Sequence, residues 1–298
     1  MNSAQGALFG VLALCGAGWG LTVPLNKIAV STGYGHFGLI FWQLVIGAAF
    51  LSLIIRLRGK SLAITWPQAA FCVVIALTGT VLPNAASYYA AARLPAGVMA
   101  LVIALVPMFA FPVALLMRNE PFAMLRMFGL LFGAAAVALL IGPAASLPDP
   151  AMALFIPIAL IAPFFYGIEG NVVAKLGTRG LDPIQLLCAA SWIGALIALP
   201  LALGSGQFID PRPPWGAPDR ALMATALIHA TVYSAYVWLV SRAGAVFAAQ
   251  VAYLVTGFGI AWSITLLGER YSGYIWAALA LLFAGLFLVQ PRKDAEKS

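Results

Sequence analysis

The chain consists almost entirely of apolar stretches, each about the length of a helix that crosses a lipid bilayer. Such a helix needs about 20 mostly apolar residues. Hydrophobic residues make up 63% of the chain and charged residues 8%, whereas a soluble domain carries about 25% charged residues. A soluble fold of 298 residues has too little interior to bury this much apolar surface. The sequence therefore predicts an all-α protein embedded in a membrane.

Charges, prolines and glycines between the apolar stretches divide the chain into ten expected transmembrane helices. Only the connection over 204–220 is long, and its many prolines indicate an irregular, solvent-exposed loop. Because the other connections are short, consecutive helices are expected to be antiparallel, with no soluble domain between them. The expected spans are 6–30, 37–57, 69–91, 96–117, 122–142, 151–175, 183–203, 221–241, 245–267 and 272–290.

The basic residues predict the orientation of these helices in the membrane. If the N-terminus is cytoplasmic, eleven of the sixteen Lys and Arg residues fall on the cytoplasmic side. This bias follows the positive-inside rule, so both termini are expected to be cytoplasmic. The basic residues are scattered over several loops rather than gathered in one stripe, which argues against a nucleic-acid partner.

The two halves of the chain resemble each other, which predicts an internal repeat with halves 1–145 and 146–298. Charged matches are informative because charged residues are so few. Five helices per half is an odd number, so the second half would enter the membrane from the opposite side. Inverted repeats of this kind build many secondary transporters, with a central site between the halves. The matched pairs are Arg93 with Arg242 and Glu120 with Glu269 at a shift of 149, and Lys27 with Lys175 at a shift of 148.

Short motifs at corresponding places complete this pattern. In the first half they are Gly18-Trp19-Gly20, Asn26-Lys27, Ala91-Ala92-Arg93-Leu94-Pro95-Ala96-Gly97 and Val106-Pro107; in the second they are Ser241-Arg242-Ala243-Gly244-Ala245 and Gly268-Glu269-Arg270. With ten spans and short loops, the chain resembles the drug/metabolite transporter superfamily in its EamA-type branch. One stretch departs from that family, because Phe41-Trp42-Gln43 stands where the second span often carries an Arg after a Pro.

The resemblance implies gradient-driven export of amino acids or other metabolites across a bacterial inner membrane. Within the superfamily, aromatic amino-acid exporters of the YddG type are the nearest well-defined group that length, topology and an aromatic-rich interior suggest. The implied partners are a small-molecule substrate, the lipid bilayer and protons as a candidate coupling ion.

Glu169 is the one charged residue expected deep in a span, in the sixth. Charge inside a membrane is costly, so an intramembrane carboxyl is a candidate functional group. It can carry a proton or pair with a substrate ammonium group. The alternatives are a structural hydrogen bond to a neighbouring helix and a passive place in a water-filled vestibule.

Other polar and aromatic residues at mid-span are expected to line a substrate cavity. Asn84, Ser87 and Tyr88 share one face of the third span, and His229 and Tyr233 share a face of the eighth, where packing is the competing role for the histidine. Aromatic walls with a few polar groups are typical of small-molecule sites, although Trp and Tyr also gather at membrane interfaces. The candidate lining is completed by Trp19, Tyr166, Gln250 and Tyr253.

No cofactor or metal is expected, and the protein is not expected to be an enzyme. The three cysteines, Cys15, Cys72 and Cys188, are far apart and lack metal-ligand spacing. The sequence also lacks a Walker loop and an H-E-x-x-H motif. Three alternatives remain: an organophosphate, nucleotide-sugar or drug exporter of the same fold, a membrane-embedded enzyme, and a receptor or scaffold.

Overall fold

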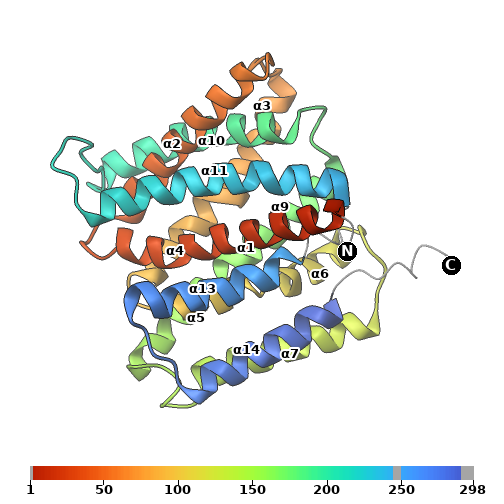
Figure 1. Cartoon of the computed structure of the whole chain (residues 1–298), viewed down its shortest axis with the longest axis vertical. Coiled ribbons are helices and arrows are strands. Elements are labelled where there is room, and N and C mark those ends of the chain that lie inside the picture. Colours follow the sequence, from red (N-terminus) through yellow and green to blue (C-terminus); the bar gives the residue numbers. More distant parts are fainter. Residues whose placement is uncertain (1–2, 244–249, 290–298) are drawn as a thin grey trace.

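The computed structural model describes residues 3–243 and 250–289, and within them every regular element is helical (Figure 1). The longest helices are α1, α2, α10 and α11, while α13 and α14 close the chain. Their bounds are Ser3–Ala29 (α1), His36–Leu57 (α2), Trp66–Ala76 (α3), Leu77–Val81 (η1), Leu82–Ala91 (α4), Ala96–Ile103 (α5), Val106–Leu116 (α6), Met124–Ile141 (α7), Pro150–Phe155 (η2), Ile156–Ala159 (α8), Ile161–Leu176 (α9), Pro183–Gly204 (α10), Ala217–Ala243 (α11), Val251–Leu267 (α13) and Gly273–Val289 (α14).

Eight helical stretches in the described residues are long and apolar enough to cross a membrane. They correspond to the first eight spans expected from the sequence, with boundaries that differ by a few residues. The ninth and tenth expected spans correspond to α13 and α14, which are apolar helices of 17 residues each. Both adjoin residues outside the described part of the chain, so a total of ten transmembrane helices stays a prediction.

Local sequence explains where the helices begin. At the start of α10, the carboxylate of Asp182 accepts a hydrogen bond from the Ile184 amide, and Gln185 accepts one from the Asp182 amide. This reciprocal pair is a capping box, which satisfies amides that the first helical turn leaves open. The connection over 205–216 forms no regular element, as its prolines predict.

Three spans are interrupted near the middle. The third contains η1, a π-helical turn just before Pro83, and the fourth breaks at Ala104–Leu105, between α5 and α6. The sixth is assembled from η2, α8 and α9. Proline removes a backbone donor and clashes with the preceding turn, and π-turns often mark functional sites. The interrupted spans contact one another, since α9 packs against both α4 and α6.

The helices pair in a pattern that is symmetric between the two halves. The first span, α1, packs against α11 and α13, and its counterpart α9 packs against α4 and α6. Exchanging the halves converts one set of contacts into the other. Two further pairs, α2 with α10 and α7 with α14, each join equivalent spans (Figure 1). This pairing is what an internal repeat of five spans requires.

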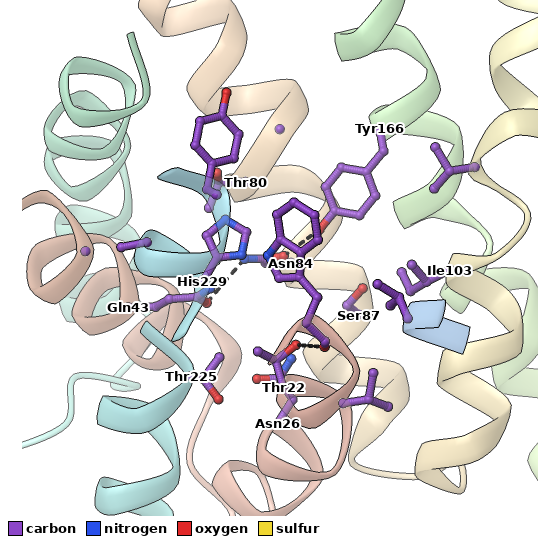
Figure 2. Close-up of a pocket in the computed structure, with 18 of the residues that line it drawn as sticks. Thr22, Asn26, Gln43, Thr80, Asn84, Ser87, Ile103, Tyr166, Thr225 and His229 are labelled. Carbon is purple, nitrogen blue, oxygen red and sulfur yellow. Dashed lines mark hydrogen bonds between the residues drawn. The ribbon is translucent and has the colours of Figure 1, made fainter. Parts of the chain in front are cut away.

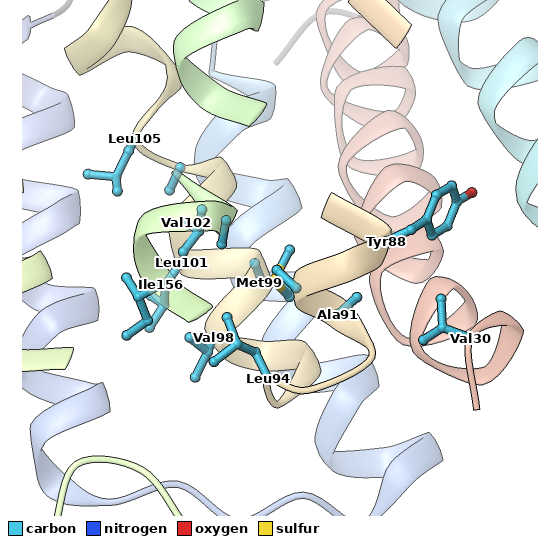
Figure 3. Packing of buried hydrophobic residues seen from close by; sticks show 14 of the residues in the cluster. Val30, Tyr88, Ala91, Leu94, Val98, Met99, Leu101, Val102, Leu105 and Ile156 are labelled. Atoms are coloured by element: carbon cyan, nitrogen blue, oxygen red, sulfur yellow. The ribbon is translucent and has the colours of Figure 1, made fainter. Parts of the chain in front are cut away.

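The largest apolar core surrounds α5. Leu94, Val98, Leu101 and Val102 are completely buried, with Ile156 of α8 against them (Figure 3). Close packing of these buried side chains fixes the position of the helix. The core therefore holds the short helix α5 rigidly beside the central interior.

Helices α7 and α14 approach closely because each has a glycine at the contact. A Cβ atom on Gly129 would stand 2.8 Å from the carbonyl oxygen of Gly285, and one on Gly285 would stand 2.8 Å from the carbonyl oxygen of Gly129. No real side chain tolerates such a distance to backbone. Small residues at helix contacts are the usual means of close approach within membranes.

Replacing Gly129 with Ala should therefore destabilise the protein by roughly 1–3 kcal/mol, the usual cost of overpacking. Gly257→Ala is the matched control, since a Cβ at Gly257 meets no atom within 4 Å. Thermal unfolding of the purified protein in detergent, followed by fluorescence, measures both variants. Equal midpoints for the two variants would show that the α7–α14 contact is not tightly packed.

Candidate functional site

A central cavity of about 560 Å³ lies between the helices of both halves. Its walls come from α1, α2, α3, η1, α4, α5 and α6 in the first half and from α9, α10, α11 and α13 in the second. Small-molecule sites typically occupy 300–1,000 Å³ and combine apolar walls with a few polar groups. The cavity has the size and composition of a site for a small metabolite.

A chain of hydrogen bonds connects polar side chains within the cavity wall (Figure 2). The hydroxyl of Tyr166 donates to Oδ1 of Asn84 over 3.0 Å, and Nδ2 of Asn84 donates to Oε1 of Gln43 over 3.3 Å. The same Gln43 oxygen accepts from the hydroxyl of Tyr88 over 2.6 Å. These bonds join α9, α4 and α2. They fix the orientation of Gln43, whose Nε2 has no hydrogen bond within the described residues.

Four other polar groups in the cavity wall lack partners. Nε1 of Trp19, Oδ1 of Asn26, Oγ of Ser87 and Oγ1 of Thr225 are buried atoms without a hydrogen bond to the residues described. Asn26, Ser87 and Thr225 come from α1, α4 and α11 and all line the cavity (Figure 2). An unsatisfied buried polar group costs roughly 1–3 kcal/mol, so water or a ligand in the cavity would stabilise these groups by completing their hydrogen bonds.

Glu169 is the one carboxylate among the described residues that line the cavity. It projects from α9 toward the π-turn η1, where a side chain at position 79 would collide with its carboxylate. Gly79 therefore makes room for the acid. The hydroxyls of Tyr166 and Tyr233 lie close enough to interact with its charge. Glu169 forms no ion pair or hydrogen bond with any residue that the structure describes.

Aromatic rings form a continuous patch beside this carboxylate. The ring of Trp19 lies 5.3 Å from that of Tyr236 and 6.2 Å from that of His229, and His229 stacks on Tyr233 at 6.5 Å, all between centroids. All four residues line the cavity. The His229 side chain is exposed, and the cavity is the space it is exposed to. A ligand that enters the cavity therefore meets an aromatic wall.

Eight of the ten residues expected from the sequence line this cavity: Trp19, Asn84, Ser87, Tyr88, Tyr166, Glu169, His229 and Tyr233. Two are not among its lining residues. Tyr253 packs on the ring of Phe283 in α14 at 5.5 Å, and Gln250 begins the described segment just before α13. They lie on the expected helix, but the lining positions of that helix are Val251, Ala252, Val255 and Thr256.

Gln43, Thr22 and Thr225 were not among the expected site residues, although all three line the cavity. The sequence does indicate Gln43 as a cavity residue, because it is a polar residue among apolar ones in the second span. Polar residues in a span usually face the protein interior or a cavity. The threonines carried little signal, because a threonine in a membrane helix commonly bonds to its own backbone, as Thr22 does to the Trp19 carbonyl.

Asn171 and the two repeated lysines have structural roles instead. Asn171 donates to the carbonyls of Ala110 and Gly167 and accepts from Asn119, so it joins α9 to α6. Lys175 donates to the Met117 carbonyl at the end of α6 over 2.8 Å. Basic side chains at such places satisfy carbonyls that helix ends leave open. Lys27 acts likewise at the end of α4, as described below.

The described residues contain no cluster of three or more His, Cys, Asp or Glu side chains that could hold a metal ion. The thiols of Cys15, Cys72 and Cys188 are free and buried. The polar groups that the cavity does offer are amides, hydroxyls, an imidazole and one carboxylate. Such groups bind and orient a small organic molecule.

The fold and the cavity together define a multi-pass membrane protein with a central small-molecule site. The family comparison agrees, because residues 5–142 and 153–290 each match the EamA-like transporter family. The two matches cover most of the chain, so the protein belongs to that family. Members are membrane transporters of small molecules rather than enzymes.

Solved structures share this fold. One, described only as "Crystal structure of protein", superposes with a TM-score of 0.67 and is 15% identical. The match covers 98% of this chain and 99% of the other. At this identity the likeness shows the fold alone. None of the curated proteins matches the chain.

Replacing two asparagines of the cavity wall with leucine is expected to change the stability of the protein in different ways. Asn84→Leu should lower the unfolding free energy by about 1–3 kcal/mol, because it leaves the Tyr166 hydroxyl without its acceptor. Asn26→Leu breaks no side-chain hydrogen bond of the described residues and should leave stability unchanged or raise it. Thermal unfolding in detergent compares the two. A larger loss for Asn26→Leu would mean that its amide has a structural partner after all.

Proposed function

We propose that this protein is a secondary transporter that exports amino acids or related small metabolites by alternating access through the central cavity. The observation that carries the proposal is a cavity built from both halves, with polar groups that the protein itself leaves without partners. We further propose that the halves are inverted, with the ten spans and cytoplasmic termini of a bacterial inner-membrane exporter. Aromatic amino acids are the first substrates to test, given the ring-lined wall.

Alternating access requires a cavity end that contacts can close and release. At the end of the cavity where α4 meets α5, the carboxylate of Glu269 accepts hydrogen bonds from the amides of Ala96 and Gly97, over 2.8 and 3.1 Å. These amides are open donors at the start of α5, where a negative charge is favoured. The bonds attach the start of α5 to the end of α13.

Lys27 holds the other side of the same junction. Its ammonium donates to the carbonyls of Ala91 and Leu94, over 2.7 and 2.9 Å, at the end of α4. Glu269 and Lys27 thus attach the turn over 91–97 to α13 and α1 through four hydrogen bonds. Hydrogen bonds to charged groups contribute roughly 1.5–3 kcal/mol each. A junction of this strength can close one end of the cavity and still release on a conformational change.

Reconstitution into liposomes tests transport directly. Efflux of radiolabelled amino acids, with and without a proton gradient, should exceed that of empty liposomes. Ala226→Trp should abolish it, because Ala226 is buried in the cavity wall and an indole there fills the path. Ala49→Trp is the matched control, since Ala49 is an exposed residue of α2 outside the lining. If no amino acid moves, or if both variants transport equally, the proposal fails.

The closing role of Glu269 has its own test. A single cysteine at Ser87, in a background with the three native cysteines replaced by Ala, reports cavity access through its rate of reaction with a membrane-impermeant maleimide. Glu269→Ala should raise that rate about tenfold by releasing the start of α5.

Asp149→Ala is the control for this rate, because Asp149 lies at the same end of the protein but caps the Ala151 amide. An unchanged labelling rate in Glu269→Ala, with the control also unchanged, would show that these bonds do not close the cavity.

A further inference from the structure

We infer that the cavity selects its substrate by a protonated amine, which Glu169 binds, and that a carboxylate or phosphate on the substrate is dispensable. This inference rests on the transport function proposed above and adds the chemical class of the substrate. It follows from the charge inventory of the wall, the surroundings of Glu169 and the aromatic patch beside it.

The charge inventory comes first. Glu169 is the one acid among the described lining residues, and none of those residues is Lys or Arg. The internal segment 244–249 has the sequence Gly-Ala-Val-Phe-Ala-Ala and contributes no cation. The described part of the wall therefore carries one formal negative charge. A carboxylate without a counter-charge inside a membrane is unfavourable, and either a proton or a bound cation removes that cost.

Three basic side chains that could supply a counter-charge, those of Lys27, Lys175 and Arg93, bind other groups of the protein instead. Lys27 donates to two backbone carbonyls, and Lys175 donates to the Met117 carbonyl. The Arg93 guanidinium lies 4.1 Å from the Tyr89 ring centroid and donates to the Tyr89 carbonyl. None of the three lines the cavity. An anionic substrate would find the imidazole of His229 and hydroxyls such as those of Ser87 and Thr225, but no lysine or arginine among the described lining residues.

The wall beside Glu169 suits an organic cation in particular. Gly79 leaves the carboxylate accessible, and the described protein gives it no hydrogen bond. Trp19, Tyr233 and Tyr236 line the same cavity with their aromatic rings. Aromatic faces attract cations by about 0.5–2 kcal/mol, and a charge-assisted hydrogen bond to a carboxylate is stronger than a neutral one. Both contributions favour an ammonium group and oppose a carboxylate.

Three molecules that share one ring separate the two charges: phenethylamine carries the amine alone, phenylalanine carries both groups, and 3-phenylpropionate carries the carboxylate alone. Binding to the full-length protein in a non-ionic detergent at neutral pH is measured by calorimetry. Phenethylamine should bind at least as tightly as phenylalanine, and 3-phenylpropionate at least about tenfold more weakly. Such a difference corresponds to about 1.4 kcal/mol.

Variants at the acid complete the test. Glu169→Gln should remove the preference for the amine over 3-phenylpropionate, and Glu169→Asp should keep it in weakened form. Asp149→Asn is the control, because it makes the same change from acid to amide on a loop, where Asn can still cap η2. Thermal unfolding of each variant shows that it is folded.

The inference is overturned if 3-phenylpropionate binds as tightly as phenethylamine, if Glu169→Gln keeps the preference, or if none of the three molecules binds. Its failure is distinct from failure of the transport proposal. Efflux of a neutral or anionic solute that Ala226→Trp blocks would leave transport intact and remove this inference. Binding of phenethylamine without transport of any solute would support this inference and contradict the transport proposal.

Discussion

Each polar group inside a membrane span must find a partner within the protein, because the hydrocarbon around it offers none. Most of the polar side chains in this protein obey that constraint. Asn171 bonds to two carbonyls, Ser263 to the Gly259 carbonyl, and the Tyr166 hydroxyl to Asn84. Against that background the few groups without partners are informative. Four of the five such buried atoms among the described residues belong to Trp19, Asn26, Ser87 and Thr225 in the wall of one cavity, and the fifth is the Tyr253 hydroxyl outside it. This concentration indicates that something other than protein completes the hydrogen bonding in the cavity.

Much of the fold follows from the sequence, because hydropathy alone determines which stretches can lie in lipid. The first eight expected spans each correspond to a helical stretch of suitable length. The repeat could also be found, since charged residues such as Glu120 and Glu269 are too rare to match by chance at a fixed shift. Prolines within the third, fourth and sixth spans, such as Pro83, Pro107 and Pro157, predict that these spans are interrupted. They do not predict the π-helical form of η1, whose own residues contain no proline.

The cavity could be predicted only in part, because its lining depends on how each helix is rotated about its axis. Asn84 and Tyr88 were identifiable because several polar residues shared one face. Tyr253 and Val255 illustrate the limit. The tyrosine faces Phe283 of α14 and the apolar valine faces the cavity, a choice made by helix packing rather than by the polarity of the residue. Gln43 shows the opposite case, in which a polar residue with few polar neighbours in its span proves central to the wall.

The repeated and the unrepeated residues differ in what they do. Arg93 lies over the ring of Tyr89, and Arg242 lies over the ring of Trp238, so both members of a repeated pair stack on the residue four positions earlier. Lys27 and Lys175, also a repeated pair, both donate to carbonyls at helix ends. The repeated charges thus support helix ends, where a transporter must open and close.

The cavity residues lack this symmetry. At the shift of 149, Glu169 corresponds to Gly20, Gln43 to Trp192 and Asn84 to Tyr233. The chemistry of the wall is therefore not imposed by the repeat, and a substitution there need not disturb the helix ends. This separation explains how one scaffold can serve different cargoes. It also explains why the family does not determine the substrate, which depends on a few unrepeated side chains around Glu169.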